Sequence, residues 1–140
     1  MSLSQTQLDL IRSSFTALRD EPVPKSMLFY ENLFRRAPHL KPMFREDLGG
    51  QGMRFMATLG AIVDNLHRPE AMADRYTDLG VGHRAIGVTA RDFEPMGKAL
   101  LDTLAQALGD EFTSEKREAW ALAFAEFSND IIEKGEIPPE

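Results

Sequence analysis

The chain has 140 residues, of which 43% are hydrophobic and 27% are charged, with a formal net charge of −6. This composition is typical of one soluble globular domain with a buried core. The negative charge argues against nucleic-acid binding, and the absence of cysteine excludes disulfides and thiol chemistry. No signal peptide and no apolar run of membrane-spanning length is visible, so we expect a cytoplasmic protein without a membrane partner.

The first forty residues predict two helices. Apolar residues recur every three or four positions over residues 8–18, and Ser4 with Gln7 forms a capping box before them. A second helix is predicted to start near Pro24, where a missing N–H does no harm, and to end at Pro38. We therefore expect two successive helices with a short break at the prolines.

The middle of the chain predicts two further helices around a glycine corner. Residues 39–44 are too few for a full helix, and Gly49–Gly50 is interpreted as a flexible corner. A longer helix is predicted from Gln51, with apolar residues along one side. Pro69 then begins another helical stretch, which is predicted to run to His83.

Two long helices are predicted in the last third of the chain. Thr89 with Asp92 opens the first of them, and Gly109 closes it. Either Thr113 or Ser114 caps the last helix. The buried face of that helix is predicted to consist of Trp120, Phe124, Phe127 and Ile131.

These elements define the expected fold class. The chain has only four valines and no clean alternation of apolar and polar residues, which argues against β-sheets. We predict one all-α domain of six to eight helices over residues 1–140. Short corners between helices of unequal length favour crossed packing over a regular bundle.

Residues that could carry chemistry are scarce. The three histidines, His39, His67 and His83, include no i, i+4 pair of the kind that a helical zinc site needs. The phosphate-loop, Gly-x-Ser-x-Gly and Glu-x-x-His motifs are absent. What remains is His83 late in a helix, Tyr30 on an apolar helix face and Gln51 at a helix start. Each has an ordinary structural explanation, so composition and spacing alone indicate an all-α soluble domain.

The order of three segments resembles the globin family across nearly the whole chain. Residues 29–44 look like the second globin helix and the corner that ends in a phenylalanine packing on the haem plane. Residues 51–56 with Leu59–Gly60 look like the distal helix, and residues 79–83 with Gly87–Val88 look like the proximal helix and its exit. The pairing of a tyrosine with a glutamine is closer to bacterial single-domain globins and flavohaemoglobin haem domains than to myoglobin-like chains.

The resemblance implies a globin fold around one haem b (iron protoporphyrin IX). His83 would give a neutral imidazole nitrogen to the iron, and its other nitrogen should donate to a backbone carbonyl or a side chain. Arg54 would pair with a haem propionate, although an exposed helix arginine is an equal alternative. The apolar slot for the porphyrin would be formed by Phe44, Phe55, Leu59, Leu79, Val88, Phe93 and Met96.

The resemblance also implies that Tyr30 and Gln51 face a small gas ligand. Dioxygen held in such a site carries partial negative charge, and a hydrogen bond to a charged group contributes roughly 1.5 to 3 kcal/mol. Carbon monoxide is less polar and should gain less. Position 93 departs from the flavohaemoglobin pattern, because Phe93 stands where a tyrosine would join a hydrogen-bonded network around the proximal histidine. We therefore do not expect His83 to donate electron density strongly to the iron.

Three functions remain open at this stage. The first is reversible binding of dioxygen, with nitric oxide and carbon monoxide as related ligands. The second is nitric oxide dioxygenation with a separate reductase, since these 140 residues include no flavin or nicotinamide domain. The third, a gas sensor, ranks last because no output domain is visible. A haem-free interaction module is disfavoured by the presence of both His83 and Phe44, and His39 and His67 are expected at the surface without a role.

Overall fold

The computed structural model describes residues 3–44 and 47–140, which form six α-helices and four short 3₁₀ helices. The α-helices are α1 (Gln5–Arg19), α2 (Pro22–Arg36), α3 (Leu48–Asp64), α4 (Ala73–Ala85), α5 (Phe93–Leu108) and α6 (Ser114–Gly135). The 3₁₀ helices are η1 (Pro38–Met43), η2 (Pro69–Met72), η3 (Ala90–Asp92) and η4 (Gly109–Glu111). The prediction of an all-α fold of six to eight helices is confirmed over the described ranges.

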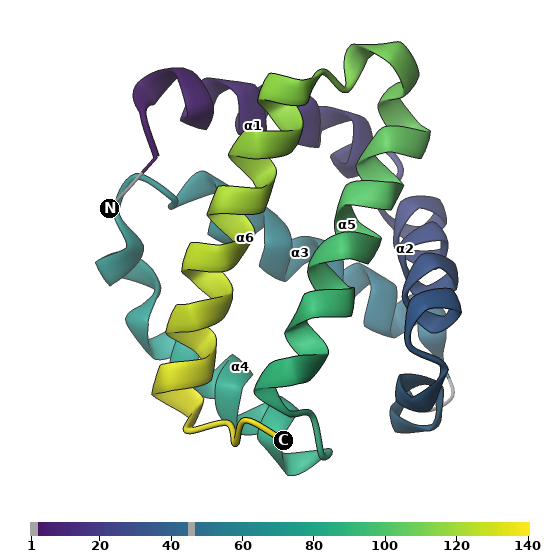
Figure 1. The fold of residues 1–140 in the computed structure, drawn as a ribbon, viewed down its shortest axis with the longest axis vertical. Coiled ribbons are helices and arrows are strands. Elements are labelled where there is room, and N and C mark those ends of the chain that lie inside the picture. Colours follow the sequence, from purple (N-terminus) through teal and green to yellow (C-terminus); the bar gives the residue numbers. More distant parts are fainter. Residues whose placement is uncertain (1–2, 45–46) are drawn as a thin grey trace.

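The helices cross one another instead of forming a regular bundle. Helices α5 and α6 lie side by side at the front of Figure 1, and α1 passes across both near one end. Helix α3 passes behind them, α2 packs against α3 and α5, and α4 packs against α6. This arrangement agrees with the crossed packing expected from the short corners. Within the two described ranges, no helix combines the length and apolar character that crossing a membrane requires.

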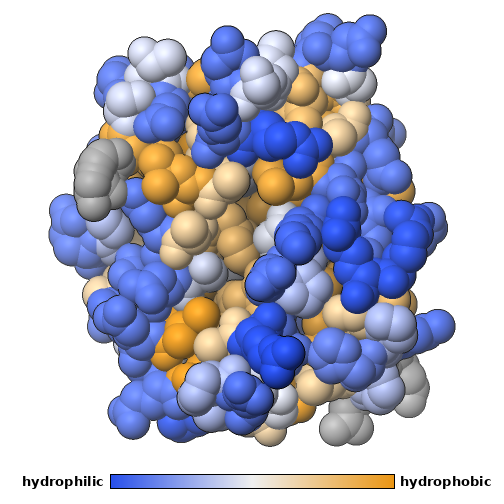
Figure 2. Space-filling view, viewed as in Figure 1, coloured by the Kyte–Doolittle hydropathy of each residue, from blue (hydrophilic) through white to orange (hydrophobic). Residues whose placement is uncertain are grey.

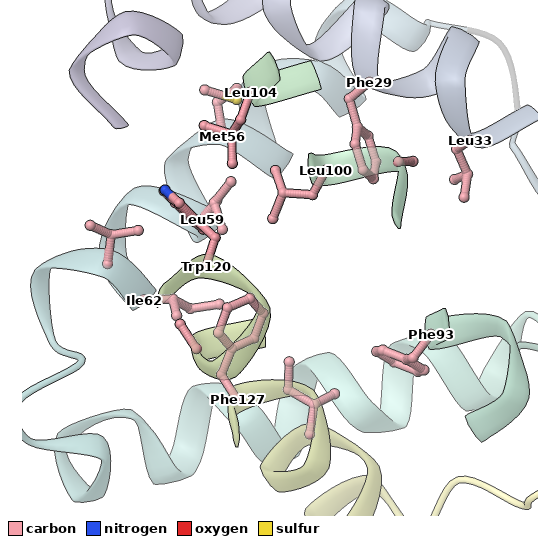
Figure 3. Packing of buried hydrophobic residues seen from close by; sticks show 14 of the residues in the cluster. Phe29, Leu33, Met56, Leu59, Ile62, Phe93, Leu100, Leu104, Trp120 and Phe127 are labelled. Atoms are coloured by element: carbon pink, nitrogen blue, oxygen red, sulfur yellow. The ribbon is translucent and has the colours of Figure 1, made fainter. Parts of the chain in front are cut away.

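The core is centred on aromatic and branched side chains of several helices. Trp120 of α6 is fully buried, and its indole Nε1 donates a hydrogen bond of 2.7 Å to Ser14 Oγ of α1. The ring of Phe15 packs against the Trp120 ring at a centroid distance of 6.1 Å. Figure 3 shows Trp120 and Phe127 of α6 beside Leu59 of α3, so these two helices share the same apolar cluster.

The predicted caps fix where several helices begin. Ser4 accepts from the Gln7 backbone N–H, and the Gln7 side chain accepts from the Ser4 N–H, so the capping box before α1 is confirmed. The same reciprocal arrangement links Thr89 and Asp92 around η3, directly before α5. Thr113, one of the two predicted candidates, caps α6 through a bond from the Lys116 N–H. These caps satisfy N–H groups that would otherwise lack partners.

The predicted start of the third helix was wrong. Helix α3 begins at Leu48 instead of Gln51, so Gly49 and Gly50 lie in its first turn and form no flexible corner. The physical reason is Asp47, which adopts a left-handed conformation (φ 57°) and accepts a hydrogen bond of 3.1 Å from the Gly50 N–H. A Cβ at position 50 would overlap the Asp47 carboxylate, so glycine suits this capped turn.

Two other boundaries also differ from the expected ones. Helix α2 begins at Pro22, two residues before the predicted Pro24, because a proline is tolerated in the first turn. The stretch predicted from Pro69 divides into the 3₁₀ helix η2 and helix α4, and α4 extends beyond His83 to Ala85. Gly87, with φ of 97°, follows α4 in a conformation that favours glycine.

A close approach of two glycines places α4 against α6. A Cβ added at Gly80 would meet the Gly135 backbone and the Ile131 carbonyl oxygen, and a Cβ at Gly135 would meet the Gly80 backbone. The two helices therefore touch backbone to backbone, three residues before His83. Because His83 lies on α4, this contact sets how far its ring stands from α6.

We expect Gly80→Ala to lower the free energy of unfolding by about 1–3 kcal/mol, because the new methyl group has no room. Gly82→Ala is a matched control on the same helix, since a Cβ there meets nothing within 4 Å. The control should raise stability by up to about 1 kcal/mol through its helix propensity. Urea unfolding of the three proteins measures both effects, and equal destabilisation by the two substitutions would contradict the close approach.

Candidate functional site

A cavity of about 330 Å³ lies among helices α2 to α6. Figure 3 shows part of its wall, with Phe29 and Leu33 of α2 on one side and Phe93 of α5 on the other. All eleven site residues expected from the sequence line this one cavity. They are Tyr30, Phe44, Gln51, Arg54, Phe55, Leu59, Leu79, His83, Val88, Phe93 and Met96. The structure therefore brings together residues that are up to 66 positions apart (96 − 30) in the sequence.

His83 lies in the last turn of α4, half-buried at the cavity wall. Its Nδ1 is 2.6 Å from the Leu79 carbonyl oxygen, one turn earlier in the same helix. Because a carbonyl can only accept, Nδ1 carries the proton and Nε2 keeps its lone pair. The Phe93 ring lies 5.6 Å from the imidazole between centroids and offers no hydrogen-bond donor. The imidazole therefore has one fixed tautomer and one free ligating nitrogen.

Tyr30 comes from α2 and is buried among aromatic rings. The Phe44 ring meets it edge-on at 5.0 Å, and Phe34 and Phe55 each lie 6.2 Å away between ring centroids. Burial raises the pKa of Tyr30 to about 12, although the nearby Arg54 charge acts in the opposite direction. The phenol therefore stays protonated at neutral pH and can donate a hydrogen bond into the cavity.

Gln51 lies in the first turn of α3 and lines the same cavity. Its Oε1 is buried, and no hydrogen-bond partner for it exists among the described residues. A buried amide oxygen without a partner is costly, because its bonds to water are lost and none replaces them. Gln51 therefore brings to the cavity wall a polar group that the described protein residues leave unpaired.

A second, more polar hollow forms the mouth of the cavity. It shares Gln51, Arg54 and His83 with the cavity and adds Arg75 and Asp78 of α4. Arg54 is exposed at this mouth. Its position is compatible with both alternatives given for it, an exposed helix arginine and a partner for a haem propionate. Arg75 was not expected from the sequence. The signal that could have found it is its spacing, because it lies eight residues before His83 on the same face of α4.

The family model described as Globin matches residues 28–131, a range that contains every one of the eleven expected site residues. The chain belongs to the globin family. The globin fold is thus shown together with the cavity, and the family implies a haem cofactor and binding of small gases. Membership in the bacterial subgroup, expected from Tyr30 and Gln51, stays a prediction.

Relatives of this globin come from more than one group. A neuroglobin of Dissostichus mawsoni is 28% identical over 132 residues, covering 84% of this chain and 83% of that protein. Neuroglobin-1 of Oncorhynchus mykiss is 26% identical over the same length and coverage. A flavohemoprotein of Rhizobium meliloti (strain 1021) is 25% identical over 130 residues, covering 91% of this chain. The globin spans only 32% of that flavohemoprotein's length.

The residues of this globin's cavity fit a haem. The wall is apolar, which suits the porphyrin faces, and the free Nε2 of His83 is a suitable iron ligand. Arg54 and Arg75 at the mouth supply the positive charge that propionates require. These residues supply the apolar wall, the iron ligand and the positive charge that would hold the cofactor.

The remaining wall residues of the globin cavity were not singled out from the sequence as site residues. They are Phe29, Leu33, Leu40, Met43, Thr58, Ile62, Ile86, Leu100, Phe124, Phe127 and Ile131. Most of them lie on apolar helix faces, for which the sequence periodicity predicts burial but does not show whether they face a cavity. Which core positions face a cavity depends on how the helices pack. His39 and His67 are exposed, as expected, and His39 Nε2 lies 2.8 Å from Asp92 Oδ1.

The raised tyrosine pKa values predict the alkaline titration of this globin. Burial raises the pKa of both Tyr30 and Tyr76 to about 12, against about 10 in an unfolded chain. The unfolded state releases these protons first, so the free energy of unfolding falls as pH rises from about 10 towards 12. Ultraviolet absorbance of Tyr76→Phe isolates the Tyr30 signal and should show no tyrosinate near pH 10. A midpoint near the ordinary value would contradict the burial of Tyr30.

Proposed function

We propose that this globin, as a single domain over residues 1–140, holds haem b through His83 and reversibly binds dioxygen. Nitric oxide and carbon monoxide would be related ligands of the same site. The observation that carries the proposal is a protonated Tyr30 hydroxyl in the same apolar cavity as His83. A pocket with one imidazole ligand and one neutral donor suits a ligand that becomes partly negative on binding.

His83 would act as the proximal ligand. A bound haem would supply the ferrous iron to which the gas attaches. The hydrogen bond from His83 Nδ1 to the Leu79 carbonyl fixes the ring orientation and, in the neutral imidazole, leaves the lone pair on Nε2. Val88 supports this geometry, because its backbone N–H donates to the His83 carbonyl at 3.1 Å. His83 is thus held at two points, by its ring Nδ1 and by its backbone carbonyl.

Tyr30 would stabilise dioxygen by donating its hydroxyl proton in a hydrogen bond. No other hydrogen bond engages this hydroxyl within residues 3–44 and 47–140. Its ring is confined by Phe34 and Phe44, so little rotational freedom is lost on binding. Gln51 would assist, since rotating its carboxamide by half a turn presents the NH₂ group to the ligand.

Nitric oxide dioxygenation is the second candidate. The observation that favours it is the same apolar, donor-equipped cavity, which would retain dioxygen until nitric oxide arrives. One nitric oxide, one dioxygen and one electron from a separate reductase would give one nitrate. Phe93 beside His83 weakens this candidate, because it provides no hydrogen bond to increase electron donation from the imidazole. Counting nitrate per haem with and without a reductase separates a catalyst from a carrier.

We expect Tyr30→Phe to speed dioxygen release by roughly tenfold or more, because it removes a hydrogen bond to a partly charged ligand. Carbon monoxide release should change less, since that ligand is less polar. Tyr76→Phe is the matched control: Tyr76 is equally buried but lies outside the cavity wall. Stopped-flow measurements of the dissociation rates of dioxygen and carbon monoxide test this prediction. A dioxygen release rate in Tyr30→Phe equal to that of the control would remove Tyr30 from the mechanism.

A further inference from the structure

A third hollow, of about 420 Å³, lies on the outer face of the molecule, between α5 and α6. These two helices are at the front of Figure 1, and Figure 2 shows patches of hydrophobic residues (orange) at the surface on this face, among hydrophilic ones (blue). We name this hollow the α5–α6 groove. Its floor is formed by apolar side chains that include Leu101, Phe124 and Ile132. It is separate from the polar mouth beside Arg54.

The α5–α6 groove and the central cavity share two wall residues. Phe93 of α5 and Phe124 of α6 each line both hollows. At this point, therefore, the protein wall between solvent and cavity is only one side chain thick. A side chain with one face on each hollow can connect them when it rotates.

Phe124 is the more exposed half of this wall. Its side chain is only half-buried, and it lies directly on the α5 backbone at Gly97. A Cβ at position 97 would approach the Phe124 ring to 2.8 Å, so a larger residue there would push the ring aside. Phe93, in contrast, is buried, contacts the His83 ring and follows the capped turn before α5. Phe93 therefore forms the buried half of the wall.

The polar groups of the α5–α6 groove are all engaged within their own helices. Lys98 Nζ pairs with a carboxylate oxygen of Glu94 at 3.2 Å. The Ser128 hydroxyl donates to a carbonyl of α6, and the Asn129 amide donates to a carboxylate one turn further along α6. The apolar floor of the groove suits an apolar ligand, although the exposed Lys98–Glu94 pair also lines it. The mouth has three charged side chains, Arg54, Arg75 and Asp78.

From these observations we propose that the α5–α6 groove is an entrance for small apolar gases, and that rotation of the Phe124 ring admits them to the cavity. The proposal rests on the proposed function, because the gas must have a binding site inside. The movement required is rotation of the half-buried Phe124 ring away from its contacts with Gly97 and Phe127, with α5 and α6 staying in place.

Two substitutions of opposite size test the gate in the haem-loaded protein. After flash photolysis, Phe124→Ala should raise the carbon monoxide association rate at least about threefold, equal to about 0.65 kcal/mol in the barrier, and Phe124→Trp should lower it by a similar factor. Dissociation rates should change by the same factor, because a gate alters the barrier in both directions, so the equilibrium constant should stay near that of the wild type. Phe112→Ala is the matched control, because Phe112 is also half-buried but lines neither the cavity nor the groove.

A second readout does not depend on the haem. Wild-type crystals pressurised with xenon should show xenon in the groove against the Phe124 ring. Equal association rates in the two Phe124 variants, or xenon confined to the side of the cavity near Arg54, would overturn the proposal. A wild-type protein that binds no gas would instead refute the proposed function, so the two failures are distinguishable.

Discussion

The hydrogen bond from His83 Nδ1 to the Leu79 carbonyl determines which imidazole nitrogen is available to the cavity. Without it, either tautomer could form and the ring could turn away from the position in which Nε2 is free. The bond depends on α4 being helical up to Ala85, and the place of α4 depends on the backbone contact between Gly80 and Gly135. A packing constraint more than fifty residues away in the sequence thus controls the orientation of the ligand that the site requires.

The chemistry of the cavity follows from how few polar groups it contains. An apolar wall excludes water, which strengthens any hydrogen bond made inside it. Burial keeps the pKa of Tyr30 high, so this side chain remains a donor over the whole neutral range. Two surface hollows of different polarity share wall residues with the cavity, the polar mouth at Arg54 and the apolar groove at Phe124. A charged cofactor edge suits the first, and an uncharged gas suits the second.

Local features of the sequence predicted the fold well, because caps and helical periodicity act over a few residues. The Thr89–Asp92 box is an example. The start of α3 was missed because the two glycines outweighed Asp47, a preferred N-cap residue, whose left-handed conformation turns them into a capped first turn. The site itself was located by resemblance, since neither Tyr30 nor His83 is distinctive alone. Arg75 was missed because the mouth forms only where residues of α3 and α4, distant in the sequence, line the same hollow.

The central claim is that Nε2 of His83 binds the iron of a haem. The most direct test is the visible spectrum of the ferrous protein reconstituted with haem, for wild type, His83→Gly and the exposed control His39→Gly. The account predicts that the control matches the wild type, and that His83→Gly loses the wild-type spectrum until free imidazole restores it. A wild-type spectrum in His83→Gly without imidazole, or a wild-type protein with ample haem and no Soret band, would contradict it.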